Sequence, residues 1–185
     1  MPTVKFLTWN VRGLRARPKR NAVLSYLKAQ RAEIMVLVET HLTGQLMMTL
    51  KKPWVGWVYQ APHTPNSRGV AILVAKTAQF VLLSLRSDPL GRFLFLHAKV
   101  HGLELLILAI YIPPPFQFSV LTEGLGFMSP YPTVPAIWLG DFNNVPNNDL
   151  DRMSPTPPDC PPPAQTRFGR LLLDLELVET RASAR

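Results

Sequence analysis

The sequence has a single cysteine, Cys160, among its 185 residues. One cysteine excludes an internal disulfide and a cysteine-based metal site, and it fits a reducing compartment, the nucleus or the cytoplasm. The longest apolar run covers residues 105–112, far short of the about 20 residues that a membrane-spanning helix needs. Residues 1–10 lack the basic and then apolar layout of a signal peptide, so we expect neither secretion nor a membrane partner.

Acidic residues are also scarce, and their distribution is uneven. The chain has 12 Asp and Glu against 20 Lys and Arg, a formal net charge of +8, and no acid precedes Glu33. A basic lobe of this kind attracts polyanions, and phosphate contacts dominate the affinity of proteins for nucleic acids. We therefore expect DNA as a partner, contacted by Arg12, Arg15 and Arg17. Charge alone leaves open that the lobe is only a solubilising face.

Hydrophobic patterning predicts a mixed α/β fold in one domain over residues 1–185. With 47% hydrophobic and 17% charged residues, the chain can bury a core. Strands are predicted at 4–9, 33–38, 54–60, 69–75, 80–85, 92–100, 103–112 and 134–139, and helices at 19–30, 42–50 and 166–178. The two residues 101–102 predict a hairpin turn, and residues 154–163, with six prolines, predict a loop. This element order favours sheets packed inside with helices outside.

Polar residues follow three of the predicted strands. Asn10 follows the first strand, Glu39 follows the second, and Asp141 and Asn143 follow the strand at 134–139. Because side chains alternate across a strand, residues two apart such as Asp141 and Asn143 should point the same way. Strand ends beside loops are frequent sites of chemistry. Taken singly, each of these residues is more often a cap, a turn residue or half of a surface ion pair.

Six short motifs in order give the chain a resemblance to a known family. They are Thr8-Trp9-Asn10-Val11-Arg12-Gly13-Leu14, Glu39-Thr40-His41-Leu42-Thr43, Arg68-Gly69-Val70-Ala71-Ile72-Leu73, Ile110-Tyr111, Gly140-Asp141-Phe142-Asn143 and Leu150-Asp151-Arg152. The chain resembles the endonuclease/exonuclease/phosphatase superfamily, and within it the apurinic-like endonuclease domain of LINE-type (non-LTR) retrotransposons. The resemblance implies a four-layer α/β sandwich, in which two packed mixed β-sheets are flanked by helices.

The resemblance also implies a metal-dependent endonuclease that nicks DNA. In it, Glu39 matches the carboxylate that binds Mg²⁺, or Mn²⁺ in its place, and a hard cation does prefer oxygen ligands. Asn10 matches the amide that positions the metal site, and Tyr111 matches a hydroxyl donor to the scissile phosphate. Asp141 matches the acid that orients or deprotonates the attacking water, and Asn143 matches the amide that holds the phosphate. A reverse transcriptase in the same polyprotein is the further partner implied.

Two departures from the family pattern bear on activity. Arg12 stands where some repair-type relatives carry an acid, which favours a DNA-facing contact. The family ends with a late aspartate and a Ser-Asp-His segment, whereas no histidine follows His101 in this sequence. We therefore expect a domain that is incomplete at its C-terminus, lacks its C-terminal strands, and is weak or inactive as a nuclease. Two alternatives stay open: a non-catalytic nucleic-acid-binding remnant, and a phosphatase or lipid phosphodiesterase of the same fold.

The histidines and tryptophans suggest structural roles. His41, His63, His97 and His101 do not have a metal-ligand spacing, and we expect them to be solvated or locally hydrogen-bonded. Trp9, Trp54, Trp57 and Trp138 are expected in the core.

Overall fold

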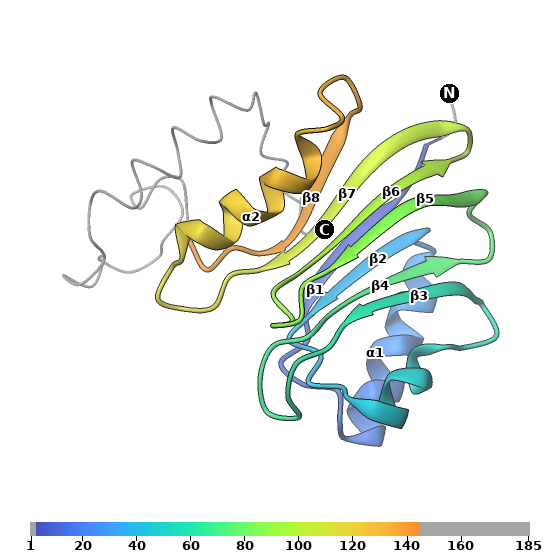
Figure 1. The fold of residues 1–185 in the computed structure, drawn as a ribbon. Coiled ribbons are helices and arrows are strands. Elements are labelled where there is room, and N and C mark those ends of the chain that lie inside the picture. The colour runs from blue at the N-terminus through green and yellow to red at the C-terminus, as the bar shows by residue number, and fades with distance from the viewer. Residues whose placement is uncertain (1–2, 145–185) are drawn as a thin grey trace, which may run out of the picture. The chain divides into compact units, whose positions relative to one another are not determined.

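The computed structural model describes residues 3–144, of which residues 3–142 belong to one compact unit. This unit contains two four-stranded sheets, with the strand orders β1-β2-β4-β3 and β5-β6-β7-β8 (Figure 1). The elements are β1 (Phe6–Asn10), α1 (Arg17–Gln30), β2 (Ile34–Val38), η1 (Gly44–Leu50), β3 (Val55–Ala61), β4 (Val70–Ala75), β5 (Phe80–Ser87), β6 (Phe93–Val100), β7 (Leu103–Tyr111), α2 (Phe118–Met128) and β8 (Ala136–Asp141). The proline-rich loop at 154–163 and the helix at 166–178 lie outside the described residues.

Both sheets are mixed, which confirms the predicted fold class. In the first sheet β1 and β2 are parallel, while β4 is antiparallel to both β2 and β3. In the second sheet β5, β6 and β7 are antiparallel neighbours, and β8 joins β7 in parallel. The hairpin between β6 and β7 turns at His101 and Gly102, whose φ angles are 49° and 81°. Positive φ at both positions is the geometry of a tight hairpin turn that follows strand twist.

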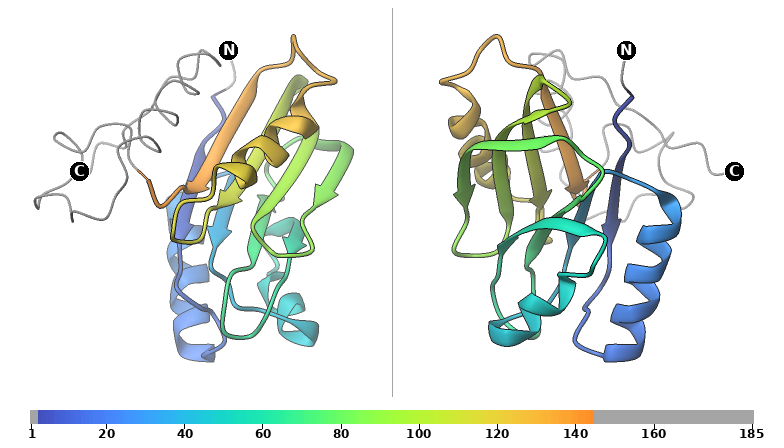
Figure 2. Two further views of the ribbon diagram at one scale, coloured as in Figure 1. Left: turned by 60° about the vertical axis from the view of Figure 1, so that its left-hand side comes forward. Right: turned by 90° about the vertical axis from the view of Figure 1, so that its right-hand side faces the viewer.

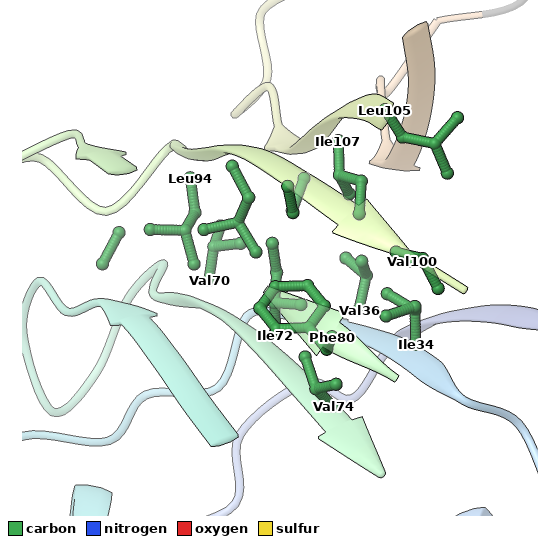
Figure 3. Close-up of a cluster of buried hydrophobic side chains, with 14 of the residues drawn as sticks. Ile34, Val36, Val70, Ile72, Val74, Phe80, Leu94, Val100, Leu105 and Ile107 are labelled. Carbon is green, nitrogen blue, oxygen red and sulfur yellow. The ribbon is translucent and has the colours of Figure 1, made fainter. Parts of the chain in front are cut away.

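The core lies between the two sheets, and strand alternation determines which side chains enter it. Alternate residues of the central strands, such as Val36 and Ile72 in the first sheet and Leu94 and Ile107 in the second, are fully buried there (Figure 3). Their neighbours in the first sheet, including Leu37, face α1 instead and form a second cluster with it. Period-2 alternation with both faces buried is what a sheet between a helix layer and another sheet requires.

The helices cover the outer faces of the sheets, as Figure 2 shows for α1 and α2. The sequence reasoning missed α2, which contains Gly124 and Gly126, since each glycine in a helix interior costs about 1 kcal/mol relative to alanine. Tertiary contact explains the glycine at 124, because a Cβ there would lie 3.1 Å from the Leu108 side chain. Two tryptophans correct the expectation that all four are core residues: Trp9 is 38% and Trp57 43% exposed. No helix in residues 3–144 is long and apolar enough to cross a membrane.

Candidate active site

Three of the predicted site residues lie on the inner faces of their strands, at strand ends. Tyr111 ends β7 in the same alternation as the buried residues of the inter-sheet core, and it belongs to that core itself. Asp141 ends β8 in register with Tyr111, and Asn10 ends β1 in register with Val38. Since residues two apart share a face of a strand, alternation turns all three side chains toward the space between the sheets.

The amide of Asn10 joins two carboxylates. Its Nδ2 donates to Oε1 of Glu39 and to Oδ2 of Asp141, both at 2.7 Å. Its Oδ1 accepts the backbone N–H of Arg12 at 3.1 Å. Because only the oxygen of an amide can accept that bond, Arg12 fixes the orientation that aims the NH₂ group at the carboxylates. The two carboxylate oxygens therefore lie no more than twice 2.7 Å apart.

Glu39 reaches this position through an unusual backbone. Strand alternation alone would direct the residue after Val38 toward the helix side, but Glu39 and His41 adopt left-handed φ angles of 55° and 54°. Such angles are uncommon for residues other than glycine, and they occur where surrounding structure holds them. Here the Glu39 carbonyl accepts the N–H of Gly13 at 2.7 Å, and the N–H of His41 bonds to the Arg68 carbonyl at 3.0 Å.

Two glycines are required by close approach in the same region. Gly69 has φ 91°, and a Cβ on it would lie 2.6 Å from the Thr40 hydroxyl. Only glycine therefore lets β4 begin this close to residues 39–41, which we call the Glu39 loop. Gly140 has φ 149°, and a Cβ there would lie 1.8 Å from the carbonyl oxygen of Ile110. That contact brings β8 against β7 directly before Asp141.

Tyr111 is held in its protonated form. Burial raises the pKa of its hydroxyl to about 12, and the charge and hydrogen bond of Glu39 and the charge of Asp141 act in the same direction. The positive charge of Arg68 opposes them. A phenol with this pKa stays a hydrogen-bond donor at neutral pH, next to two carboxylates.

Sequence reasoning missed two residues that lie at the site. His41 Nε2 lies 3.8 Å from Glu39 Oε2, and Arg68 is close enough to influence the pKa of Tyr111. Both stand inside the quoted motifs, His41 two residues after Glu39 and Arg68 directly before Gly69, so position within a motif was the available signal. His97 bonds locally to Glu104 at 2.7 Å, whereas the partner of His101 at 2.8 Å is Glu33, 68 residues away in the sequence.

Asn143 and the three arginines have different surroundings. β8 ends at Asp141 and Asn143 has φ 46°, so the alternation that was expected to align Asn143 with Asp141 does not extend to it. Asn143 belongs to the second unit, residues 143–185. Arg12, Arg15 and Arg17 are exposed, and among the described residues none forms an ion pair; Arg15 donates to the amide oxygen of Asn66 at 3.2 Å.

The chemistry of these side chains fits a hard divalent cation. Within residues 3–144, no group of three or more His, Cys, Asp and Glu side chains gathers as a metal cage. Mg²⁺ does not need such a cage, since it keeps several waters and binds through one or two carboxylates and the phosphates of a substrate. Glu39 and Asp141, brought together by Asn10, supply such a pair of oxygen donors.

Two mixed sheets packed face to face, with polar residues from both sheets meeting at strand ends, define the class of this protein as a layered α/β sandwich. The family model described as "Endonuclease/Exonuclease/phosphatase family" matches residues 7–175. The chain belongs to this family.

Relatives and solved structures agree with this assignment. A 106-residue stretch is 31% identical to the transposon TX1 uncharacterized 149 kDa protein of Xenopus laevis, covering 57% of this chain and 8% of that protein. The AP endonuclease LMAP of Leishmania major superposes with a TM-score of 0.69 at 18% identity, over 93% of this chain and 66% of that one. An AP endonuclease of Archaeoglobus fulgidus gives 0.57 at 22%, over 94% and 71%. At these identities the structures show the shared fold.

Proposed function

We propose that the protein hydrolyses phosphodiester bonds of DNA with the help of Mg²⁺, or of Mn²⁺ in its place, as the nicking endonuclease of a LINE-type retrotransposon. The observation that carries this proposal is the amide of Asn10 held between the carboxylates of Glu39 and Asp141, beside a protonated Tyr111. The similarity to a transposon protein supports the retrotransposon context. A reverse transcriptase in the same polyprotein is the partner that this context implies, in the nucleus or the cytoplasm.

Each side chain has a distinct role in the proposed reaction. Glu39 would hold the cation close to Asp141, and the cation when bound would stabilise negative charge on the phosphate. Asp141 takes a proton from the attacking water while the water oxygen forms a bond to phosphorus. The bond between phosphorus and the leaving sugar oxygen breaks, and the sugar oxygen takes up a proton from solvent. Tyr111 donates its hydroxyl proton to a hydrogen bond with a phosphate oxygen. On the motif resemblance alone, we assign Asn143 the role of holding a phosphate.

Nicking of supercoiled plasmid with Mg²⁺ tests the hydrolysis. Variants are compared with the unsubstituted chain as ratios of rates, so that the comparison does not depend on the absolute rate. We expect Asp141→Asn to reduce the rate by about 10²–10⁴-fold, the usual effect of removing an acid–base group, and Glu39→Gln to reduce it by weakening the binding of the cation. Glu104→Gln, which alters an exposed carboxylate paired with His97, is the matched control and should nick normally. Equal rates for all four proteins would refute the assignment.

DNA binding is tested separately, because it does not require turnover. We propose that Arg12, Arg15 and Arg17 contact phosphates, which predicts affinity that falls steeply with salt and depends little on sequence. Replacing all three with alanine should flatten the plot of log affinity against log salt by about 2–3 units, since each phosphate contact contributes about 0.9.

A triple alanine variant of the exposed residues Lys76, Arg86 and Lys99 makes the same change in net charge and is the control. If both triple variants flatten the slope equally, the arginines only contribute to overall charge. If DNA binds but nicking never occurs under any condition, the chain is a binding protein instead of a nuclease.

A further inference from the structure

A buried ion pair closes the loop between β5 and β6. Asp88 is 3% and Arg92 9% exposed. Arg92 donates its backbone N–H and its Nε to Asp88 Oδ2, both at 2.8 Å, and its Nη2 to Oδ1 at 3.1 Å. Nη2 also donates to Glu123 of α2 at 2.6 Å. Burial works against the charge of Asp88, but the hydrogen bonds from Arg92 lower its pKa below the ordinary value of 3.8.

Such a pair needs an explanation other than stability. Removing two charges from water costs several kcal/mol per ion, and a well-packed apolar pair is often as stable or more so. A bidentate arginine–carboxylate pair does, however, impose a defined geometry on the backbone that carries it. The Asp88–Arg92 pair therefore gives the backbone of residues 88–92 a defined geometry.

Two carbonyl groups of this loop hold parts of the candidate site in different sheets. The carbonyl of Gly91 accepts the N–H of Gly69 at 3.0 Å, and the carbonyl of Arg92 accepts the N–H of Tyr111 at 2.6 Å. Gly69 directly precedes β4 of the first sheet, and Tyr111 ends β7 of the second. Position 91 requires glycine, since its φ is 63° and a Cβ on it would lie 3.0 Å from the Gly69 nitrogen.

From Gly69 the hydrogen bonds continue to the Glu39 loop. The Gly69 carbonyl accepts the N–H of Thr40, and the Arg68 carbonyl accepts the N–H of His41, both at 3.0 Å. Thr40 and His41 directly follow Glu39, which has a strained backbone that depends on such support. The loop therefore contacts the site by two routes, one leading to Glu39 and the other to Tyr111.

We propose that Asp88 and Arg92 are positioning residues, whose ion pair holds the loop at residues 88–92 so that it sets Glu39 and Tyr111 relative to each other across the two sheets. The proposal rests on the proposed function for the claim that these two side chains act together. The ion pair touches neither substrate nor cation and acts through backbone hydrogen bonds alone. Glu123, which is half exposed, supports Arg92 from α2.

Amide hydrogen exchange measured by NMR tests the positioning role without any need for turnover. In Asp88→Asn we expect the amides of Thr40, Gly69 and Tyr111 to exchange about tenfold faster or more, because the local opening that exposes them becomes easier. The amide of Lys99, at the far end of the β6–β7 hairpin, should keep its rate. Glu104→Gln is the matched control, since it removes the carboxylate that is hydrogen-bonded to His97 in the same sheet, and it should leave the three amides unchanged.

Arg92→Lys keeps the positive charge but loses the bidentate geometry, and we expect the same local pattern in a weaker form. If Asp88→Asn does not fold, Arg92→Lys decides the question by the same comparison. Unchanged exchange at Thr40, Gly69 and Tyr111 would overturn the proposal. A uniform acceleration over all strands would also overturn it, because it would show a contribution to global stability only.

The kinetic arm separates this proposal from the proposed function. With DNA as substrate, we expect Asp88→Asn to reduce kcat by about 10–100-fold with little change in KM, since misplacing reacting groups by about 1 Å has effects of this size. A rise in KM at constant kcat would contradict positioning. If the unsubstituted chain does not cleave DNA, the proposed function fails. The exchange rates at Thr40, Gly69 and Tyr111 still decide whether the ion pair holds the backbone at these residues.

Discussion

Replacing Asn10 with alanine is the perturbation for which the structure gives the clearest consequence. The substitution removes the NH₂ group that donates to Glu39 and Asp141, and it leaves the two carboxylates facing each other. Alanine keeps the strand and introduces no steric conflict. The prediction is therefore about charge and hydrogen bonding, with little contribution from packing.

The magnitude follows from the distances. Two unit charges about 5 Å apart repel by about 3 kcal/mol at an effective dielectric constant of about 20. Water screens part of this repulsion, because the Glu39 side chain is 21% exposed. Each hydrogen bond to a charged group contributes about 1.5–3 kcal/mol when it is lost without replacement. Allowing for screening and for water entering the space, we expect Asn10→Ala to reduce the free energy of unfolding by about 2–4 kcal/mol at pH 7.

Magnesium should reverse part of this loss. A cation that binds the folded protein with a dissociation constant of about 1 mM adds about 1.4 kcal/mol of stability at about 10 mM. We expect a larger gain for Asn10→Ala than for the unsubstituted protein, since the variant has no other group to offset the repulsion. Urea unfolding with Mg²⁺ and with EDTA, followed by circular dichroism, measures both effects.

Gln60→Ala is the control for losing a side-chain amide. Gln60 Nε2 donates to the neutral carbonyl of Met47 at 3.0 Å, so its removal should cost about 1 kcal/mol and be indifferent to Mg²⁺. If Asn10→Ala unfolds within about 0.5 kcal/mol of the unsubstituted protein, the bridge between the carboxylates has no energetic role. An equal gain in stability with Mg²⁺ for Asn10→Ala and for the unsubstituted protein would show that the cation does not bind between Glu39 and Asp141.

Three further predictions concern Tyr111, Glu39 and Gly140. The pKa of Tyr111 is about 12 in the fold and 10.0 ordinarily, so the contribution of this group to stability should be complete below pH 10 and lost as pH rises through about 12. Ultraviolet titration, with Tyr111→Phe as the reference, measures this pKa. We expect Glu39→Gln to lower it and Arg68→Gln to raise it. Unchanged titration in both would contradict the geometry. Glu39→Gly should unfold at a higher temperature than Glu39→Gln, because glycine adopts φ 55° without strain. Gly140→Ala should lose more than about 4 kcal/mol or fail to fold, since its Cβ would overlap the Ile110 carbonyl, and a normal melting temperature would refute this.

Much of the fold was predictable because burial and alternation are visible in a sequence. The hairpin at residues 101–102 and the strands of both sheets were predicted within about two residues of their observed ends; the strand predicted at 134–139, for example, is found at Ala136–Asp141. α2 could not be predicted, since its two glycines lower its helix propensity and its burial against the second sheet depends on tertiary contacts. The exposure of Trp9 and Trp57 likewise depends on which strands lie at sheet edges, which no local pattern specifies.

The residues of the candidate site also differ in how far strand assignment predicts their positions. Asn10, Tyr111 and Asp141 come together by alternation and register, which a correct assignment of strands largely contains. Glu39 does not, because its carboxylate reaches Asn10 through a left-handed backbone angle that residue pattern alone does not indicate. Its membership of the site was predicted from the motif resemblance instead. The ion pair of Asp88 and Arg92 had no signal of its own, since two charges four residues apart are usually a surface pair.

The distribution of backbone strain supports a functional reading of this end of the molecule. In residues 3–142, six non-glycine residues have positive φ; Arg31 ends α1 and His101 forms a hairpin turn, where such angles are ordinary. The other four are Arg12, Glu39, His41 and Arg68, which lie in the three segments that hydrogen-bond around Glu39. Each such angle costs on the order of 1–3 kcal/mol. The strained backbone angles lower the stability of the fold next to the two facing carboxylates. They also place the carboxylate of Glu39 within hydrogen-bond distance of Asn10.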